Sequence, residues 1–177
     1  MKLFFQKQIV DETSWAPRNI REDDIPALGE LMLAAYRGTI DDEGETLEDA
    51  VAEIRGTLDG QYGPLLKDCS FAVEQGDGLV AACLITWSDV LRAPFLAYSI
   101  THPDHQSRGL GAFLIKMSVN ALAARGHREL HLVVTEGNQP AQYLYEKIGF
   151  QACGQRHPGP LQIIARGRQP ETEREIS

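Results

Sequence analysis

The sequence lacks an apolar run long enough to cross a membrane, and its first residues, MKLFFQKQIV, hold too short an apolar stretch for a secretory signal. It also lacks an excess of positive charge, since 17 lysines and arginines stand against 25 aspartates and glutamates and the net charge is −8. A protein with this balance gains nothing from counterion release on DNA or RNA. We therefore expect neither a membrane nor a nucleic acid as a partner.

Cysteine is scarce, and the three present, Cys69, Cys83 and Cys153, form no C-x-x-C pair. An odd number of cysteines without such a pair favours reduced thiols and a cytoplasmic location over a disulfide framework. His102 and His105 are three residues apart in a predicted turn, but no third ligand accompanies them. Because a protein zinc site takes at least three side-chain ligands, we predict no metal.

The 177 residues are 43% hydrophobic and 24% charged, a mix typical of a globular protein, and we expect a single domain over residues 1–177. Residues 1–14 and 167–177 are expected to be peripheral or flexible. Periodicity predicts a mixed α/β fold without repeats. The predicted strands are 17–22, 70–74, 79–87, 95–102, 129–135 and a last one beginning at 150, with 161–165 as its partner. The predicted helices are about 25–36, 46–58, 109–125 and 139–148.

Two of these helices carry start signals in the sequence. Asp23 or Asp24 is expected to cap the first helix, with Pro26 in its first turn. Thr46 and Asp49 are spaced as a variant of the capping box, which predicts that the second helix begins at Thr46.

The most informative stretch is the glycine turn, residues 106–111, which reads Q-x-x-G-x-G between a strand and a long helix. Amides at a helix start have no partner within the helix, and the helix dipole adds positive charge there. Glycines at 109 and 111 let a ligand approach those amides, so the turn is typical of a phosphate-binding site. Two other interpretations exist. The glycines could only allow close helix packing, and a Rossmann-type site is disfavoured because Leu114 replaces the third glycine.

Two motifs together resemble the GNAT family of acyl-CoA-dependent N-acetyltransferases. THPDHQSRGLGAFLI resembles the family's V-x-P strand end followed by Q/R-x-x-G-x-G/A, and NQPAQYLYEKIGF resembles N-x-x-A-x-x-L-Y-E-K-x-G-F. The likeness covers roughly residues 18–150. It implies a mostly antiparallel central sheet of six to seven strands, a splay between the fourth and fifth strands, about four helices on both faces, and acetyl-CoA as cosubstrate.

The resemblance also implies roles for particular residues. The strand end Ser99, Ile100 and Thr101 matches the segment whose main chain bonds the pantetheine arm and the acetyl group. Asn138 matches a side chain that contacts pantetheine, and Tyr145 matches the tyrosine that protonates the departing CoA sulfur. The diphosphate would be held by the segment comprising Gln106, Ser107, Arg108, Gly109, Leu110, Gly111 and Ala112.

Tyr145 also has a structural interpretation, because Ala141, Leu144 and Ile148 share its helical face and it could be a core aromatic. The general base stays open. Val133 stands where relatives that acetylate ribosomal amino termini often carry a glutamate, which argues against that ribosomal role. A bound water, Glu136 or a residue of the first two helices could serve instead, or the amine could arrive neutral.

The acidic segment, residues 41–49, follows the first predicted helix and holds six carboxylates. Such a segment is most often a solvated helix start. In this fold, however, it would overhang the acceptor site, where Asp41 and Asp42 would attract a cationic amine and Tyr36 would line the pocket.

We therefore weigh two functions of different class. The first is an enzyme that transfers an acetyl group from acetyl-CoA to a primary amine of a small molecule or peptide, and the second is a CoA-binding sensor or partner module without turnover. The sequence does not identify the acceptor. Exposed sheet edges allow a homodimer without requiring one.

Overall fold

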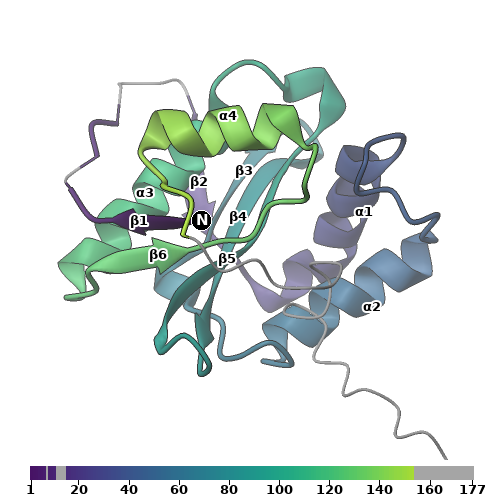
Figure 1. Ribbon diagram of the computed structural model, residues 1–177. Helices are drawn as coiled ribbons and strands as arrows, with labels where there is room; N and C mark the ends of the chain where they lie inside the picture. The colour runs from purple at the N-terminus through teal and green to yellow at the C-terminus, as the bar shows by residue number, and fades with distance from the viewer. Residues whose placement is uncertain (7, 11–14, 154–177) are drawn as a thin grey trace, which may run out of the picture.

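The computed structural model describes residues 1–6, 8–10 and 15–153, and it shows one sheet with helices on both faces (Figure 1). The strands are β1 (Lys2–Phe4), β2 (Pro17–Asn19), β3 (Phe71–Gln75), β4 (Gly78–Ser88), β5 (Ala93–Thr101) and β6 (Glu129–His131). The helices are α1 (Ile25–Tyr36), α2 (Leu47–Leu58), α3 (Leu110–Ala124) and α4 (Gln139–Ile148). Short 3-10 turns are η1 (Glu22–Asp24), η2 (Lys67–Cys69) and η3 (Pro103–His105).

The sheet has the strand order β1-β6-β5-β4-β3-β2, and every neighbouring pair is antiparallel except β5 and β6. These two parallel strands are paired at a single position, Phe95 with His131, so they diverge toward the carboxyl end of β5. This is the splay that the resemblance implied between the fourth and fifth predicted strands. The predicted mixed α/β fold, with a mostly antiparallel sheet, is confirmed.

Several element boundaries differ from the prediction. The strand predicted over 17–22 ends at Asn19, and within the described residues the strand predicted to begin at 150 is a single bridge between Gln151 and Lys2. The strand predicted over 129–135 ends at His131, where the chain turns away from β5. The first strand, β1, was missed because three residues are too few to show a two-residue period; it pairs with β6, and Lys2 also bonds Gln151. The predicted pairing of 161–165 lies outside the described residues.

Each face of the sheet has its own apolar core. On one face, Leu114 and Leu122 of α3 pack with Ile85 of β4, and α4 adds Tyr145 and Ile148. On the other face, α1 and α2 cover the sheet, and their largest fully buried apolar residues are Leu28 and Ile54. Helices α1 and α2 therefore lie on one face of the sheet that contains the splay, and α3 and α4 lie on the other (Figure 1). None of the described helices has the length and apolar character needed to cross a membrane.

The predicted capping box is confirmed at α2, where the Thr46 side chain accepts from the Asp49 amide at 3.2 Å and the Asp49 carboxylate accepts from the Thr46 amide at 2.9 Å. The predicted start of α1 is confirmed in position, because Asp24 is the N-cap residue and Pro26 lies in the first turn. The expected side-chain cap is not formed, since within the described chain the Asp24 side chain makes no capping bond to α1.

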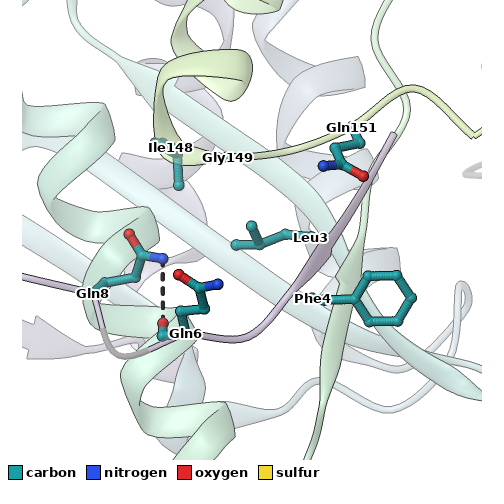
Figure 2. Close-up of a pocket in the computed structure, with 7 residues that line it drawn as sticks. All are labelled: Leu3, Phe4, Gln6, Gln8, Ile148, Gly149 and Gln151. Carbon is teal, nitrogen blue, oxygen red and sulfur yellow. Dashed lines mark hydrogen bonds between the residues drawn. The ribbon is translucent and has the colours of Figure 1, made fainter.

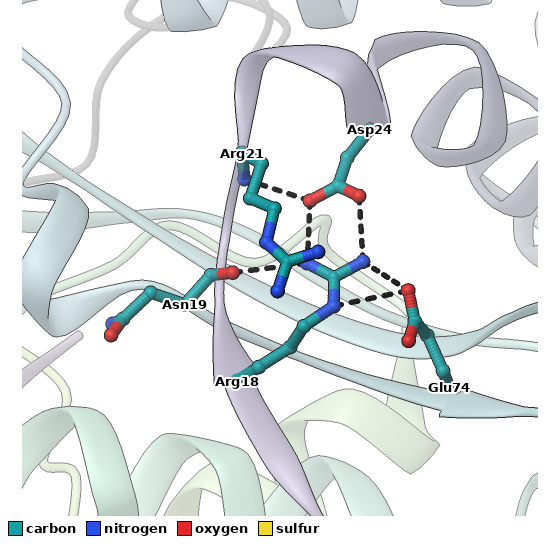
Figure 3. Close-up of polar contacts among 5 residues, drawn as sticks. All are labelled: Arg18, Asn19, Arg21, Asp24 and Glu74. Carbon is teal, nitrogen blue, oxygen red and sulfur yellow. Dashed lines mark hydrogen bonds and ion pairs between the residues drawn. The ribbon is translucent and has the colours of Figure 1, made fainter.

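The Asp24 carboxylate instead pairs with Arg18 of β2 (Figure 3). Arg18 donates through Nη1 and Nη2 at 2.7 and 2.6 Å, and the Arg21 amide adds a bond of 2.7 Å. Arg18 also pairs with Glu74 of β3. A buried carboxylate is stabilised by such partners. The guanidinium of Arg18 donates two charged hydrogen bonds to Asp24, whereas a helix amide donates one neutral bond. The pairing fixes the path from β2 into α1.

Candidate active site

The glycine turn brings the chain from the end of β5 into the first turn of α3. Gly109 is the N-cap of α3 with a φ of 81°, and Ser107 has a φ of 59°, so the turn uses left-handed backbone at two places. Among the described residues, no side chain caps α3, and its first turn contains no acidic residue. The first α3 amides therefore point out of the helix at its positive end, which suits an anion.

The first turn of α3 lies against the end of β5. A Cβ atom added at Gly111 would lie 3.6 Å from Thr101 Oγ1, 3.8 Å from Ser99 Oγ and 3.6 Å from Leu144 Cδ2 of α4. Residues that the sequence placed in one cofactor site thus meet where α3, α4 and β5 converge. Gln106, Ser107 and Arg108 are exposed, Leu110 is buried, and Ala112 is half-buried.

Main-chain groups of β5 face the splay at alternate residues. The His102 amide donates to Val80 of β4 at 2.9 Å, so the main-chain groups of Ile100 and Tyr98 also face β4. Those of Ser99 and Thr101 point the other way, toward the gap left by β6. The Thr101 carbonyl, on that side, accepts from Gln106 Nε2 at 3.3 Å. Of the three predicted strand-end residues, Ser99 and Thr101 therefore present the open edge.

Tyr145 lies in α4 with 9% of its surface exposed, and its ring contacts Phe150 edge-on with centroids 5.7 Å apart. Within the described chain its hydroxyl has no hydrogen-bond partner. Burial raises its pKa well above the usual value, and the nearby Cys83 thiol and Asp41 carboxylate raise it further. The phenol is consequently protonated at neutral pH and can donate a proton or a hydrogen bond. Both interpretations of Tyr145, core aromatic and proton donor, fit its position.

Asp41 joins two loops that are far apart in the sequence. Its carboxylate accepts from Thr135 Oγ1 at 2.5 Å and from Asn138 Nδ2 at 2.8 Å. Asn138 also caps α4, because its Oδ1 accepts from the Ala141 amide at 3.1 Å. The acidic segment is thus tied to the loop between β6 and α4. The structure brings Asn138 and Asp41 together, although the sequence assigned them to different ligands.

Asp42 bonds the main chain of its own loop. Its carboxylate accepts from the Gly38 amide at 2.6 Å and from the Gly44 amide at 3.0 Å, and these bonds lower its pKa. If Asp42 binds the acceptor as predicted, it does so while its carboxylate also accepts these two main-chain bonds.

Tyr36, at the end of α1, is half-buried and lies among acidic groups. Burial raises its pKa, as do electrostatic interactions with Tyr145, Asp41, Glu45 and Glu53. Its phenol therefore lies within electrostatic range of Tyr145 and of carboxylates from the acidic segment and α2.

Glu53 of α2 is a residue that the sequence reading missed. Its Oε1 accepts from the Tyr98 hydroxyl at 2.7 Å and its Oε2 from the Tyr62 hydroxyl at 3.0 Å. One signal was available: Glu53 follows the buried Ala50 by three residues and precedes the buried Thr57 by four, so it lies on the inward face of α2.

A separate pocket of about 240 Å³ lies between β1 and the end of α4 (Figure 2). It is lined by Leu3, Phe4, Gln6, Gln8, Ile148, Gly149 and Gln151. None of these described residues belongs to the glycine turn, the splay or the tyrosines around it. Among the described residues, moreover, no three potential metal ligands lie close enough to hold an ion.

Comparison with known proteins places this geometry in context. The model of the acetyltransferase (GNAT) family matches residues 27–150. A Bacillus subtilis (strain 168) protein provisionally named a ribosomal protein bS18-alanine N-acetyltransferase is 27% identical over 147 residues, which cover 82% of this chain and 86% of that protein. A mycothiol acetyltransferase of Clavibacter sepedonicus is 43% identical over 49 residues, 28% of this chain and 16% of its own length.

Solved structures share the fold. The complex of AAC(6')-Iy with the bisubstrate analog CoA-S-monomethyl-acetylneamine has a TM-score of 0.60 at 16% identity and covers 82% of this chain and 96% of its own. The ribosomal-protein-S18-alanine N-acetyltransferase of Escherichia coli has a TM-score of 0.59 at 23% identity and covers 78% and 79%. At these identities the likeness is one of fold.

Proposed function

The chain belongs to the acetyltransferase (GNAT) family and is an acyltransferase, and from this premise we propose that it transfers the acetyl group of acetyl-CoA directly to a primary amine in a ternary complex. The observation that carries the proposal is the convergence of three features at one place. These are the amides of the glycine turn, the open main chain of Ser99 and Thr101, and the buried phenol of Tyr145.

The glycine turn would bind the CoA diphosphate. Amides at the start of α3 supply hydrogen bonds and partial positive charge, and Arg108 adds a full charge at the exposed side of the turn. The pantetheine arm would then run along the open edge of β5 toward the splay. Asn138, the N-cap of α4, would contact the pantetheine arm, as the resemblance implies.

At the open edge, the amine nitrogen forms a bond to the thioester carbon, and negative charge develops on the carbonyl oxygen. Main-chain amides of Ser99 and Thr101 that face the gap can stabilise this charge. The C–S bond then breaks and CoA leaves as a thiolate. The nitrogen loses one proton to solvent, and the thiolate takes one from Tyr145, which regains a proton from solvent.

The raised pKa of Tyr145 affects this last step. A phenol, normally near pKa 10, donates uphill to a thiolate whose parent thiol has a pKa of about 8.5, and burial makes the phenol a still weaker acid. Donation therefore requires a short, oriented contact, which a rigid side chain on α4 can provide.

The acceptor class follows from charge and from relatives. One relative is named for a ribosomal protein alanine, and one neighbour is bound to a bisubstrate analog that joins CoA to acetylneamine. We propose a cationic primary amine here, of a small molecule or a peptide, because Asp41 is bonded to the loop that follows β6 and Glu53 to Tyr98 of β5. We also propose a cytoplasmic, single-domain protein, in keeping with its free cysteines, and the edges of β1 and β2 offer a route to a homodimer.

Tyr145→Phe tests the mechanism, with Tyr143→Phe as control because Tyr143 lies on the same helix and is 59% exposed. CoA release is followed with dithiobis(nitrobenzoate) across a panel of amines, and acetyl-CoA binding by calorimetry. We expect Tyr145→Phe to lower kcat about a hundredfold or more with unchanged acetyl-CoA affinity, and Tyr143→Phe to behave as wild type. Unchanged turnover would remove Tyr145 from the mechanism, and CoA binding without turnover of any amine would favour the sensor function.

A further inference from the structure

The Glu53 side chain is held in place by two hydroxyl groups from different parts of the chain. Tyr98 of β5 donates to Oε1 at 2.7 Å, and Tyr62, which follows α2, donates to Oε2 at 3.0 Å. Tyr62 is in turn bonded by Gln61 Nε2 at 3.2 Å. A half-buried carboxylate with both oxygens fixed in this way has a defined orientation rather than a set of solvated rotamers.

These bonds leave Glu53 with acceptor capacity and with its charge. An ionised carboxylate has about four lone-pair positions, and the two phenols fill one on each oxygen. Phenols are neutral donors, so they orient the charge without cancelling it. Within the described chain no lysine or arginine forms an ion pair with Glu53. A cationic donor from outside the chain would therefore satisfy both the remaining lone pairs and the charge.

The position of Glu53 relates it to the reaction centre. Tyr98, which bonds it, immediately precedes Ser99, whose main chain faces the splay. Tyr36 interacts electrostatically both with Glu53 and with Tyr145. Tyr36 is thus within electrostatic range of both the Glu53 carboxylate and the Tyr145 phenol, which belong to helices on different faces of the sheet, α2 and α4.

The surroundings of Tyr36 favour a cation. Its pKa is raised first by burial and then by Tyr145 and three carboxylates, those of Asp41, Glu45 and Glu53. Asp41 is bonded to Thr135 and Asn138, which leaves Glu53 as the carboxylate bonded to the strand that carries the open edge. An ammonium group of three donors and one positive charge complements this arrangement.

We propose that Glu53, oriented by Tyr98 and Tyr62, is the carboxylate that binds the ammonium group of the acceptor on the α1 and α2 side of the splay. The inference rests on the proposed acetyl transfer and deepens it, because it makes the acceptor a primary amine that arrives as a cation. Tyr36 forms the wall of this subsite toward Tyr145. Glu53 binds and positions the acceptor, and the proton that the amine must lose before attack goes to solvent.

The test compares Glu53→Gln with Glu30→Gln, which makes the same charge change on an exposed residue of the neighbouring helix α1, outside the acidic segment. Acceptor KM, acetyl-CoA KM and kcat are measured by CoA release with spermidine, neamine and a peptide with an amino-terminal alanine. We expect Glu53→Gln to raise the KM of the preferred acceptor at least about tenfold while the acetyl-CoA KM stays within twofold. Glu30→Gln should match wild type in both.

An unchanged acceptor KM in Glu53→Gln, with wild-type turnover intact, would overturn the Glu53 proposal alone. A wild-type protein that turns over no amine and binds no CoA would overturn the proposed function as well. If Glu53→Gln does not fold, Tyr62→Phe replaces it, since that variant keeps the charge and frees one oxygen. We then expect the acceptor KM to rise about threefold or more, and a rise below twofold would refute the proposal.

Discussion

The two glycines of the glycine turn should respond in opposite ways to the same substitution. Gly109 has a left-handed φ of 81°, so Gly109→Ala places a side chain in a backbone conformation that costs about 1 kcal/mol. Gly111 lies within α3, where alanine is the better helix former, so Gly111→Ala should add about 0.5–1 kcal/mol to the free energy of unfolding. The added methyl at 111 makes ordinary contacts of 3.6 to 3.8 Å and displaces nothing.

The effect on CoA should separate the two variants more clearly than stability does. No described atom lies within 4 Å of a Cβ built at Gly109, so the new methyl would project into the space beside the first α3 amides. If the diphosphate binds there, Gly109→Ala loses one charged hydrogen bond worth about 1.5–3 kcal/mol, and CoA affinity should fall about 10- to 100-fold. Gly111→Ala should bind CoA nearly as wild type, since the family motif accepts alanine at this position.

Both quantities are measurable on the same samples. Thermal unfolding should move by about 2–4 °C for each kcal/mol in a chain of this size, downward for Gly109→Ala and upward for Gly111→Ala. Calorimetric titration with CoA gives the affinity. Wild-type CoA affinity in a destabilised Gly109→Ala would refute the assignment of these amides to the diphosphate.

Two further predictions concern the polar contacts that hold the site in place. Arg18→Met leaves the buried Asp24 carboxylate without its ion-pair partner and should lower the free energy of unfolding by about 3 kcal/mol in urea titrations. The control Arg21→Met, at an exposed position, should change the free energy of unfolding little. Burial opposes ionisation of Asp24, but the hydrogen bonds from Arg18 and the Arg21 amide outweigh it and lower the pKa of Asp24. The stability lost in Arg18→Met should therefore shrink as the pH falls through that lowered pKa. A stability loss that does not change with pH would contradict this. Asn138→Ala should lose about 1 kcal/mol as a helix cap, and Asn138→Ser, which keeps a capping oxygen, should recover most of it while the bond to Asp41 stays broken. If the serine variant is as unstable as the alanine variant, the contact with Asp41 contributes more to stability than the cap does.

Local rules explain why much of the fold could be predicted. The capping box at Thr46 and the glycine turn before α3 each depend on a few consecutive residues, and both form as expected. The side-chain cap predicted for α1 did not form, although Asp24 is the N-cap residue, because the Asp24 carboxylate has a stronger partner in Arg18 of β2. Asp24 had an amide within reach, but Arg18 offered a paired, charged contact.

The acceptor side of the site shows the limit of sequence reasoning. The inward position of Glu53 on α2 is visible in the helical period, but its partner Tyr98 lies 45 residues away. The contacts of Asp41 with Thr135 and Asn138 span 94 and 97 residues. Charge alone indicated that the acidic segment faces a cation, whereas packing turned one of its carboxylates toward another loop.

The sequence by itself determined the family, the glycine turn and the order of helices and strands, because each follows from residues that are neighbours in the chain or that repeat with a fixed period. The tertiary structure alone decided where β6 separates from β5 and which carboxylates hydrogen-bond to other residues of the chain. It also decided that Glu53 is bonded to the strand that contains Ser99. Periodicity tells which side of a helix faces the protein, but the partner it meets there is fixed only when the whole sheet and its two cores have assembled.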